Sequence, residues 1–370
     1  MIGAGKNFAV MFFGGTEVTL AVATQAGESF QIKSRVSADY SGIFDGNFVD
    51  EAELVHVMND LVNNALENMT LKIEKLYIGV PPVFCDLIVR DAAQHFNRPR
   101  RVNQNDIRKL IQGCTYYADD RTVIGKDILF FKLDDGRAVI HAAGTSCAKL
   151  EAKIGIISCR NVFVEAVMSA LFGTYFSRIE FISQTAAEAL YYIENDVRDR
   201  TCVLVSCGMF STTVSVAAGE GLCFMESFHM GTAHVINDLC IVLGVDHVAA
   251  TALLAGVVLS INAEEGECYE IETNGKREQF SITKVNDIVK ARLEEIAEGI
   301  KTLLNKAEDR VNSDRIFICG GEVDAIIGAR DFLSKEIGVH IDQCLCPLTR
   351  QNTSKQVLAN ALLCLAGRNT

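Results

Sequence analysis

The sequence predicts an α/β protein built from two related halves, and three observations lead to this fold class. Hydrophobic residues make up 49% of the 370 residues and only 4 residues are proline, so the chain has enough apolar surface for a large core. A strand, a glycine turn and a second strand open the chain at residues 8–23, and the same pattern returns at 202–217, about 190 residues later. Helical stripes alternate with the strand patterns. We therefore expect a duplicated α/β unit.

The first half contains its predicted elements in a clear order. Strand patterns lie at 8–13, 18–23, 31–38 and 76–80, and a helical stripe lies at 50–67. Strand, helix and strand patterns resume at 154–157, 162–172 and 179–183.

Residues 84–155 differ in character from their surroundings. Charges become denser, Asn97–Arg101 predicts a basic turn, and Asn105 or Asp106 is placed to cap a helix. Strands at 128–133 and 138–142, joined by Asp-Asp-Gly-Arg, are typical of a hairpin. We expect a small α+β insertion here.

The second half repeats the strand and turn at its start and then carries its own inserted piece. Residues 269–272 and 277–282 flank Asn274-Gly275, a pair that suits a type I′ hairpin turn. A long helix is predicted at 285–306, a strand at 316–319 and a terminal helix at 355–365. The apolar stretch 248–261 is too short to span a bilayer and predicts a core helix.

Charge and cysteine content exclude several classes of protein. The formal net charge is −12, which argues against a general nucleic-acid binder and against a polybasic membrane anchor. The 13 cysteines form no C-x-x-C motif and mostly lie in apolar runs, which favours buried free thiols in a reducing cytosol over a zinc or redox site. No signal peptide is visible.

Three glycine turns, each directly after a strand, are the features that point to a ligand. They are Gly14-Gly15-Thr16, Gly208 to Thr212, and Gly320-Gly321. Glycine lets the backbone approach a phosphate closely, and amides at strand ends donate to phosphate oxygens. Each turn alone is a weak signal, and glycines that only preserve the fold are the alternative.

Longer motifs carry a family resemblance. Ser41–Asp50 is similar to the form S-x-G-I-x-x-G-x-I-x-D, Met230–Asp238 to I-G-G-x-x-[VI]-T-x-D, and Ala291–Ile296 to P-R-x-E-E-I. With these motifs the chain resembles the actin/Hsp70/sugar-kinase ATPase superfamily, and within it the bacterial cell-division family FtsA. The resemblance implies an actin-like (ribonuclease H-like) two-domain α/β fold with a central cleft and a small 1C-type insertion.

The resemblance also implies a division into domains. The expected parts are a first actin-like domain at 1–83 and 156–200, an inserted 1C-like subdomain at 84–155, a second actin-like domain at 201–350 with a 2B-like insertion at about 240–306, and a C-terminal helix at 351–370 that packs back on the first domain.

If the family's nucleotide site is retained, the matching residues are Gly14, Gly15, Thr16, Gly208, Ser211, Thr212, Gly231, Thr232, Gly320 and Gly321. The departures fall on the acidic positions of the two phosphate hairpins. Phe12 stands at the first, and Ser206 and Thr213 stand at the two acidic positions of the second, where Met209 and Phe210 also replace glycines. The stretch 249–254, near the element that touches adenosine in the family, holds no charge.

These departures predict weak or absent hydrolysis. Loss of one preorganised electrostatic group typically costs about 10²–10³ in rate. We therefore expect no catalytic residue, no metal site and no cofactor, and ATP with Mg²⁺ is the alternative left open. An ATP-binding, slowly hydrolysing actin homologue would need replacement carboxylates, for which Glu17 is the nearest candidate.

The expected function is an FtsA-like actin-fold scaffold of bacterial cell division or morphogenesis that acts through protein contacts. The resemblance implies FtsZ or other division proteins as partners, with Lys290 and Arg292 as the residues to meet an acidic peptide, and self-association through the 1C-like insertion. The chain ends soon after its terminal helix, so we expect a cytoplasmic protein without a direct membrane anchor that a partner recruits to the membrane or septum. A PilM-like platform of type IV pilus assembly is the second alternative.

Overall fold

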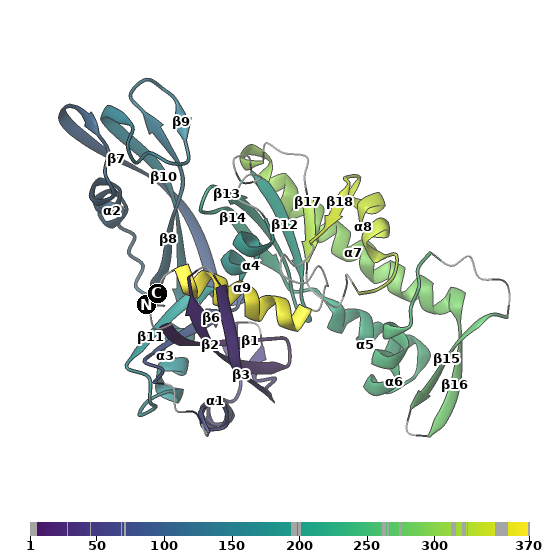
Figure 1. Ribbon diagram of the computed structural model, residues 1–370. Helices are drawn as coiled ribbons and strands as arrows, with labels where there is room; N and C mark the ends of the chain where they lie inside the picture. The colour runs from purple at the N-terminus through teal and green to yellow at the C-terminus, as the bar shows by residue number, and fades with distance from the viewer. Residues whose placement is uncertain are drawn as a thin grey trace. The chain divides into compact units, whose positions relative to one another are not determined.

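The computed structural model describes residues 6–27, 29–44, 46–67, 69, 72–193, 198, 201–260, 264, 266–273, 275–311, 316–319, 323, 325–344 and 354–368. The chain divides into two compact units (Figure 1). Unit 1 comprises Met1–Thr201, Ser215–Met225 and Lys355–Thr370, and unit 2 comprises Cys202–Val214 and Glu226–Ser354. The domain boundaries drawn from the sequence stay predictions.

Unit 1 is built on a five-stranded sheet in the order β11-β6-β1-β2-β3. Its strands are β1 (Lys6–Phe13), β2 (Glu17–Ala26), β3 (Ser29–Asp39), β6 (Lys75–Val80) and β11 (Arg178–Ser183). Strand β1 pairs antiparallel with β2 and parallel with β6, so β1 lies at the centre of the sheet. Its last six residues are buried, as expected for a strand that is covered on both faces.

Helices cover this sheet. They are α1 (Glu51–Leu66), α3 (Asn161–Ala170), α4 (Gln184–Tyr192) and α9 (Ser354–Arg368), and the short elements β4 (Ile43–Phe44), β5 (Asn47–Phe48) and the 3-10 turn Pro82–Phe84 lie between them in the chain. The side chain of Asp50 caps α1 by accepting from the amide of Glu53. Phe12 of β1 shares a buried cluster with Leu362 of α9. The C-terminal helix is therefore part of the core of unit 1.

The insertion forms a second sheet, in the order β7-β10-β8-β9. Its elements are β7 (Cys85–Arg101), α2 (Gln104–Gly113), β8 (Arg121–Leu133), β9 (Ala138–Val139) and β10 (Ser146–Arg160). The three long strands and α2 are visible in Figure 1. Leu110 of α2 shares a buried cluster with Leu150 and Ile154 of β10.

The basic segment Arg98–Arg101 lies in β7, and its prediction as a turn is wrong. Arg100 and Arg101 pair with Cys147 and Ser146 of β10. The register shifts between Cys147 and Lys149, so the residues around Pro99 are taken up as an irregularity. A proline is tolerated here because β7 is at the edge of its sheet.

The cap of α2 also differs from the prediction. Asn103, not Asn105 or Asp106, is the N-cap, and its side chain accepts from the amide of Asp106 at 3.1 Å. Asp106 returns the contact by accepting from the amide of Asn103 at 3.0 Å. This reciprocal pair is a capping box with an acid three residues after the cap.

Unit 2 repeats the sheet of unit 1. Its sheet runs in the order β14-β13-β12-β17-β18, formed by β12 (Cys202–Cys207), β13 (Thr212–Ala218), β14 (Gly221–Phe228), β17 (Ile316–Cys319) and β18 (Ile341–Gln343). The segment Ser215–Met225 of β13 and β14 is counted with unit 1. In both sheets the first three strands in the chain lie in reverse order on one side and two later strands follow on the other. This shared order confirms the duplicated α/β unit.

The remaining elements of unit 2 are α5 (Thr232–Leu243), α6 (His247–Ala255), the hairpin β15 (Cys268–Thr273) and β16 (Lys276–Ser281), α7 (Ile282–Ala307), the 3-10 turn Glu308–Arg310 and α8 (Ala329–Ile337). Asn274 lies outside the described residues. The core helix predicted at 248–261 ends at Ala255. Gly256 is its C-cap, and the amide of Gly256 donates to the carbonyls of Leu253 and Leu254.

Most of the described cysteines are buried. Among the described helices, no single one has the length and apolar character to cross a membrane, and the bent pair α5 and α6 meets that test only by length and composition.

Candidate functional site

The two glycine turns predicted from the sequence are built in the same way. In unit 1 the amide of Gly14 donates to the carbonyl of Glu17 at 2.7 Å, and in unit 2 the amide of Gly208 donates to the carbonyl of Ser211 at 2.9 Å. Each bond closes a hairpin with a two-residue loop, Gly15-Thr16 in one case and Met209-Phe210 in the other. The repeated pattern in the sequence therefore corresponds to a repeated local structure.

In unit 1 the position that is acidic in the family lies in the core. Gly14, Gly15 and Thr16 are exposed at the turn, and the carbonyl of Thr16 accepts from the amide of Tyr40 at 2.9 Å. Phe12 is only 3% exposed and belongs to the apolar cluster under α9. Position 12 therefore contributes packing and no charge.

Gln184 is a residue near this turn that the sequence analysis missed. Its buried amide Nε2 donates to the carbonyl of Phe13 at 3.0 Å and to that of Gly79 at 3.2 Å. It thereby joins the carboxyl ends of β1 and β6, the edge of an open α/β sheet where ligands bind. A polar Ser-Gln-Thr run between a strand and an alanine-rich helix was the signal that could have found it.

In unit 2 the hairpin is bonded directly to the start of α5. The amide of Thr232 donates to the carbonyl of Gly208 at 3.1 Å, and the amide of Ala233 donates to that of Met209 at 2.8 Å. A Cβ atom on Gly231 would lie 2.2 Å from the carbonyl oxygen of Gly208, so this close approach requires glycine. The first amides of a helix commonly bind anions. Here the amides of Thr232 and Ala233 donate to carbonyls of the hairpin turn instead.

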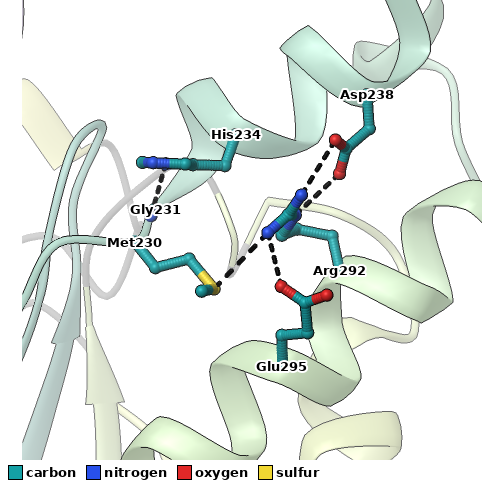
Figure 2. A network of polar contacts seen from close by, with 6 residues as sticks. All are labelled: Met230, Gly231, His234, Asp238, Arg292 and Glu295. Carbon is teal, nitrogen blue, oxygen red and sulfur yellow. Dashed lines mark hydrogen bonds and ion pairs between the residues drawn. The ribbon is translucent and has the colours of Figure 1, made fainter. Parts of the chain in front are cut away.

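Side chains strengthen the same junction. The hydroxyl of Thr212 donates to the carbonyl of Met230 at 2.8 Å. The amide of Gly231 donates to Nδ1 of His234 at 3.2 Å, which Figure 2 shows. The structure thus brings together five of the predicted residues, Gly208, Ser211, Thr212, Gly231 and Thr232, whereas Gly320 and Gly321 lie outside the described residues.

The second hairpin lacks carboxylates at the positions where the family has them. Ser206 is half-buried, and Thr213 is 2% exposed with its hydroxyl 2.8 Å from that of Ser227. Met209 is half-buried and Phe210 is 45% exposed. Neutral hydroxyls at these positions supply no charge for Mg²⁺, which binds one or two carboxylates beside substrate phosphates.

A fit to nucleotide can be tested on this junction. Thr232 Oγ1 is buried without a hydrogen-bond partner, so one hydroxyl is available to an oxygen ligand. Against this, the amides of Thr232 and Ala233 are occupied. Among the described residues, no cluster of three or more His, Cys, Asp or Glu is placed to hold a metal ion. Among the described residues of this junction, a triphosphate would therefore meet one hydroxyl without a partner, while two helix amides are already bonded to the turn.

Arg292, one of the two predicted partner residues, lies in an internal network (Figure 2). Its Nε and Nη2 donate to the two carboxylate oxygens of Asp238 at 2.7 and 2.9 Å, and Nη1 donates to Glu295 at 2.5 Å. The hydrogen bond to Asp238 raises the pKa of Arg292 above its ordinary value. This pair ties α7 to α5, so binding of an acidic peptide by Arg292 would first have to break it.

Lys290, the other predicted partner residue, lies two residues earlier on α7. It is half-buried and makes no ion pair with any residue that the structure describes. Its role toward a partner stays a prediction.

Comparison with known proteins shows what this chain is similar to. No family model matches the sequence. The chain is 25% identical over 264 residues to cell division protein FtsA of Porphyromonas gingivalis, a match that covers 69% of this chain and 54% of the relative. The chain therefore spans about half the length of this curated relative.

Two solved structures cover nearly the whole chain. The PilM-PilN type IV pilus biogenesis complex matches with a TM-score of 0.64 at 12% identity and covers 98% of each chain. MreB5 of Spiroplasma citri bound to AMPPNP matches with a TM-score of 0.56 at 10% identity and covers 98% of this chain and 95% of that one. The chain has the actin-like fold and is similar to FtsA. Both the fold class and the resemblance expected from the sequence are confirmed.

Proposed function

We propose that this actin-fold protein is a scaffold of bacterial cell division or morphogenesis that works through protein–protein contacts, with ATP hydrolysis lost or weak. The similarity to FtsA and the actin-like fold support the scaffold family. The proposed loss of hydrolysis rests on the residues that stand here at the positions that are acidic in the family. Phe12 is in the core and Thr213 is bonded to Ser227.

Each missing carboxylate removes an interaction with the metal or with the attacking water. One such group is worth about 10²–10³ in rate, and the loss of several that act together is at least as large. The MreB5 structure holds AMPPNP. In this chain, however, the amides at the start of α5 are already bonded to the second hairpin. We therefore expect no Mg²⁺-dependent turnover.

Calorimetry and a phosphate-release assay with Mg-ATP test this part of the proposal. The expected result is no phosphate release above background, both for the protein and for a Thr232→Ala control that removes the hydroxyl without a hydrogen-bond partner. Phosphate release that requires Mg²⁺ and saturates with ATP would overturn it and support the slowly hydrolysing actin homologue.

The partner side of the proposal needs a binding test. We propose FtsZ or another division protein as the partner, a cytoplasmic location with recruitment to the membrane or septum, and self-association through the insertion. Retention of FtsZ by the immobilised full chain, reduced by Lys290→Glu, is the expected result. No retention at micromolar protein would contradict the FtsZ assignment.

A second candidate function is a PilM-like platform of pilus assembly. The observation that favours it is the fold match to PilM in the PilM-PilN complex, which covers 98% of each chain. Retention of an inner-membrane pilus protein, with no retention of FtsZ, would select this alternative.

A further inference from the structure

A groove of about 600 Å³ runs beside strand β7 in the insertion. One wall consists of five consecutive residues of β7, residues 90–94, and the other of Lys109 and residues around the end of α2. Side chains alternate between the two faces of a strand, so a groove over one face would be lined by every second residue. Five residues in a row mean that the groove follows the edge of the strand.

This edge is open to a further strand. Among the described strands, β7 is the first in the order β7-β10-β8-β9 and pairs only with β10. The stretch from Cys85 to His95 pairs with β10 in continuous register, and the irregularity near Pro99 lies beyond it. Proline, bulges and covering loops are the usual protection of such edges. Residues 90–94 contain no proline and no bulge. A groove lies where a covering loop would otherwise lie.

The charges of the groove select an acidic occupant. Arg90 and Lys109 line it with Asp91, and neither of the two cations makes an ion pair within the described part of the chain. Residues 84–155 hold 12 of the 35 Lys and Arg and 9 of the 47 Asp and Glu, so this region carries +3 while the rest of the chain carries −15. Opposite potentials steer association and suppress wrong partners.

Gln94, which lines the groove, carries a buried side-chain oxygen, Oε1, that has no hydrogen-bond partner. A small rotation of this side chain would offer the oxygen to a donor in the groove. Backbone N–H groups of an added strand are donors of that kind.

We propose that the edge of β7 at residues 90–94 binds an extended acidic segment of a partner protein by strand addition. The inference rests on the proposed scaffold function and names one of its contact surfaces. Backbone hydrogen bonds to β7 would supply the affinity. Arg90 and Lys109 would select acidic side chains on the added strand.

The test uses the full chain and a short peptide of alternating glutamate and valine as the probe. Fluorescence anisotropy should show binding of this peptide that is at least about tenfold tighter than binding of its lysine–valine counterpart. The double variant Arg90→Glu with Lys109→Glu should reverse this preference. Arg98→Glu makes one such charge reversal on β7 outside the groove, and should leave the preference for the glutamate–valine peptide unchanged.

A second readout separates strand addition from simple charge attraction. Hydrogen exchange should slow at backbone amides within residues 90–94 when the glutamate–valine peptide binds. A glutamate–valine peptide with every backbone amide N-methylated carries the same charge but has no backbone N–H to donate, so it cannot form the strand pairing. It should bind at least about tenfold more weakly. Equal binding of the two, or no protection of these amides, would overturn the proposal.

Two further outcomes decide the occupant and the dependence on the proposed function. A dimer of the chain alone that Arg90→Glu with Lys109→Glu dissolves would show that a second copy takes the groove, and would overturn the assignment to a separate partner. Mg²⁺-dependent ATP hydrolysis would overturn the proposed loss of hydrolysis and leave the peptide result standing. Failure of peptide binding in a protein without ATPase activity would overturn only this inference.

Discussion

Gly231 is the residue at which the junction of the second hairpin and α5 is most sensitive to substitution. A Cβ atom there would lie 2.2 Å from the carbonyl oxygen of Gly208 and 2.7 Å from that of Met209. Both obstacles are backbone atoms held by hydrogen bonds, so neither moves cheaply. We expect Gly231→Ala to lower the free energy of unfolding by about 2–3 kcal/mol, as overpacking does.

Gly113→Ala is the matched control for this measurement by urea unfolding. No atom lies within 4 Å of its added Cβ, and Gly113 is the last residue of α2. The substitution should leave stability unchanged or raise it by up to about 1 kcal/mol. Equal losses for the two variants would contradict the close approach at Gly231.

Arg292 offers a comparison between two ion pairs made by one guanidinium. Its side chain is 21% exposed; Asp238 is 22% exposed and bound in two-point geometry, whereas Glu295 is 58% exposed. Desolvated, two-point pairs are strong, and exposed pairs contribute little. Double-mutant cycles should therefore give a coupling of about 1–2 kcal/mol between Arg292 and Asp238, and less than about 0.5 kcal/mol between Arg292 and Glu295. A coupling of Arg292 to Glu295 that is larger than its coupling to Asp238 would contradict this ranking of the two ion pairs in Figure 2.

At the scale of elements, the start of α2 gives a direct test of its cap. Asn103 accepts from the amide of Asp106, whereas Asn105 accepts from the exposed side chain of Arg108. Asn103→Ala should cost about 1 kcal/mol of stability and Asn105→Ala no more than about 0.5 kcal/mol. Thermal or urea unfolding would check both. A greater loss for Asn105→Ala would restore the cap predicted from the sequence.

Local patterns predicted most elements, and the errors have a common cause. Apolar runs ended by glycine turns located β1, β2, β12 and β13. By contrast, Arg98–Arg101 has the composition of a turn, yet it lies in β7 because an edge strand tolerates proline and takes up a bulge. Which strand is at an edge depends on distant residues, and no local pattern contains that information.

The candidate site was predictable in part for a similar reason. The glycines at 14, 208 and 231 stand out in the sequence, and the structure gives those of unit 2 a common junction. Gln184 was missed because its partners, the carbonyls of Phe13 and Gly79, are more than a hundred residues away in the chain. The hydrogen bonds that close the start of α5 likewise join backbone atoms, which carry no sequence signal.

At the scale of the whole molecule, contacts inside unit 1 join segments from three distant parts of the chain. The turn between β13 and β14 lies against β8, where the amide of Glu220 donates to the carbonyl of Ile128 at 3.0 Å. A Cβ atom on Gly219 would lie 2.1 Å from the carbonyl oxygen of Leu129, and one on Gly221 would lie 2.5 Å from Cβ of Asp127. The C-terminal helix adds Arg368, whose Nη1 is 3.8 Å from Glu220. The turn therefore covers part of the side chain of Asp127 on β8, which is half-buried.

The burial of Asp127 makes the free energy of unfolding depend on pH in a defined direction. Burial, followed by the nearby charge of Glu220, raises the pKa of Asp127 to about 7, and Arg368 opposes the rise. The unfolded chain releases this proton near pH 4. Between these two values the folded state therefore binds more protons, and stability falls as the pH rises.

The expected loss between pH 4 and pH 7 is about 2–4 kcal/mol, and Asp127→Asn should abolish it because an amide does not ionise. The charged groups that act on Asp127 are Glu220 on the turn and Arg368 on α9, so Glu220→Gln is the control. It removes a negative neighbour and should weaken the slope without abolishing it. Urea unfolding of the three proteins across this range measures the slopes. If the free energy of unfolding changed with pH in the same way for the parent and for Asp127→Asn, this would show that Asp127 is solvated and that the turn does not bury it.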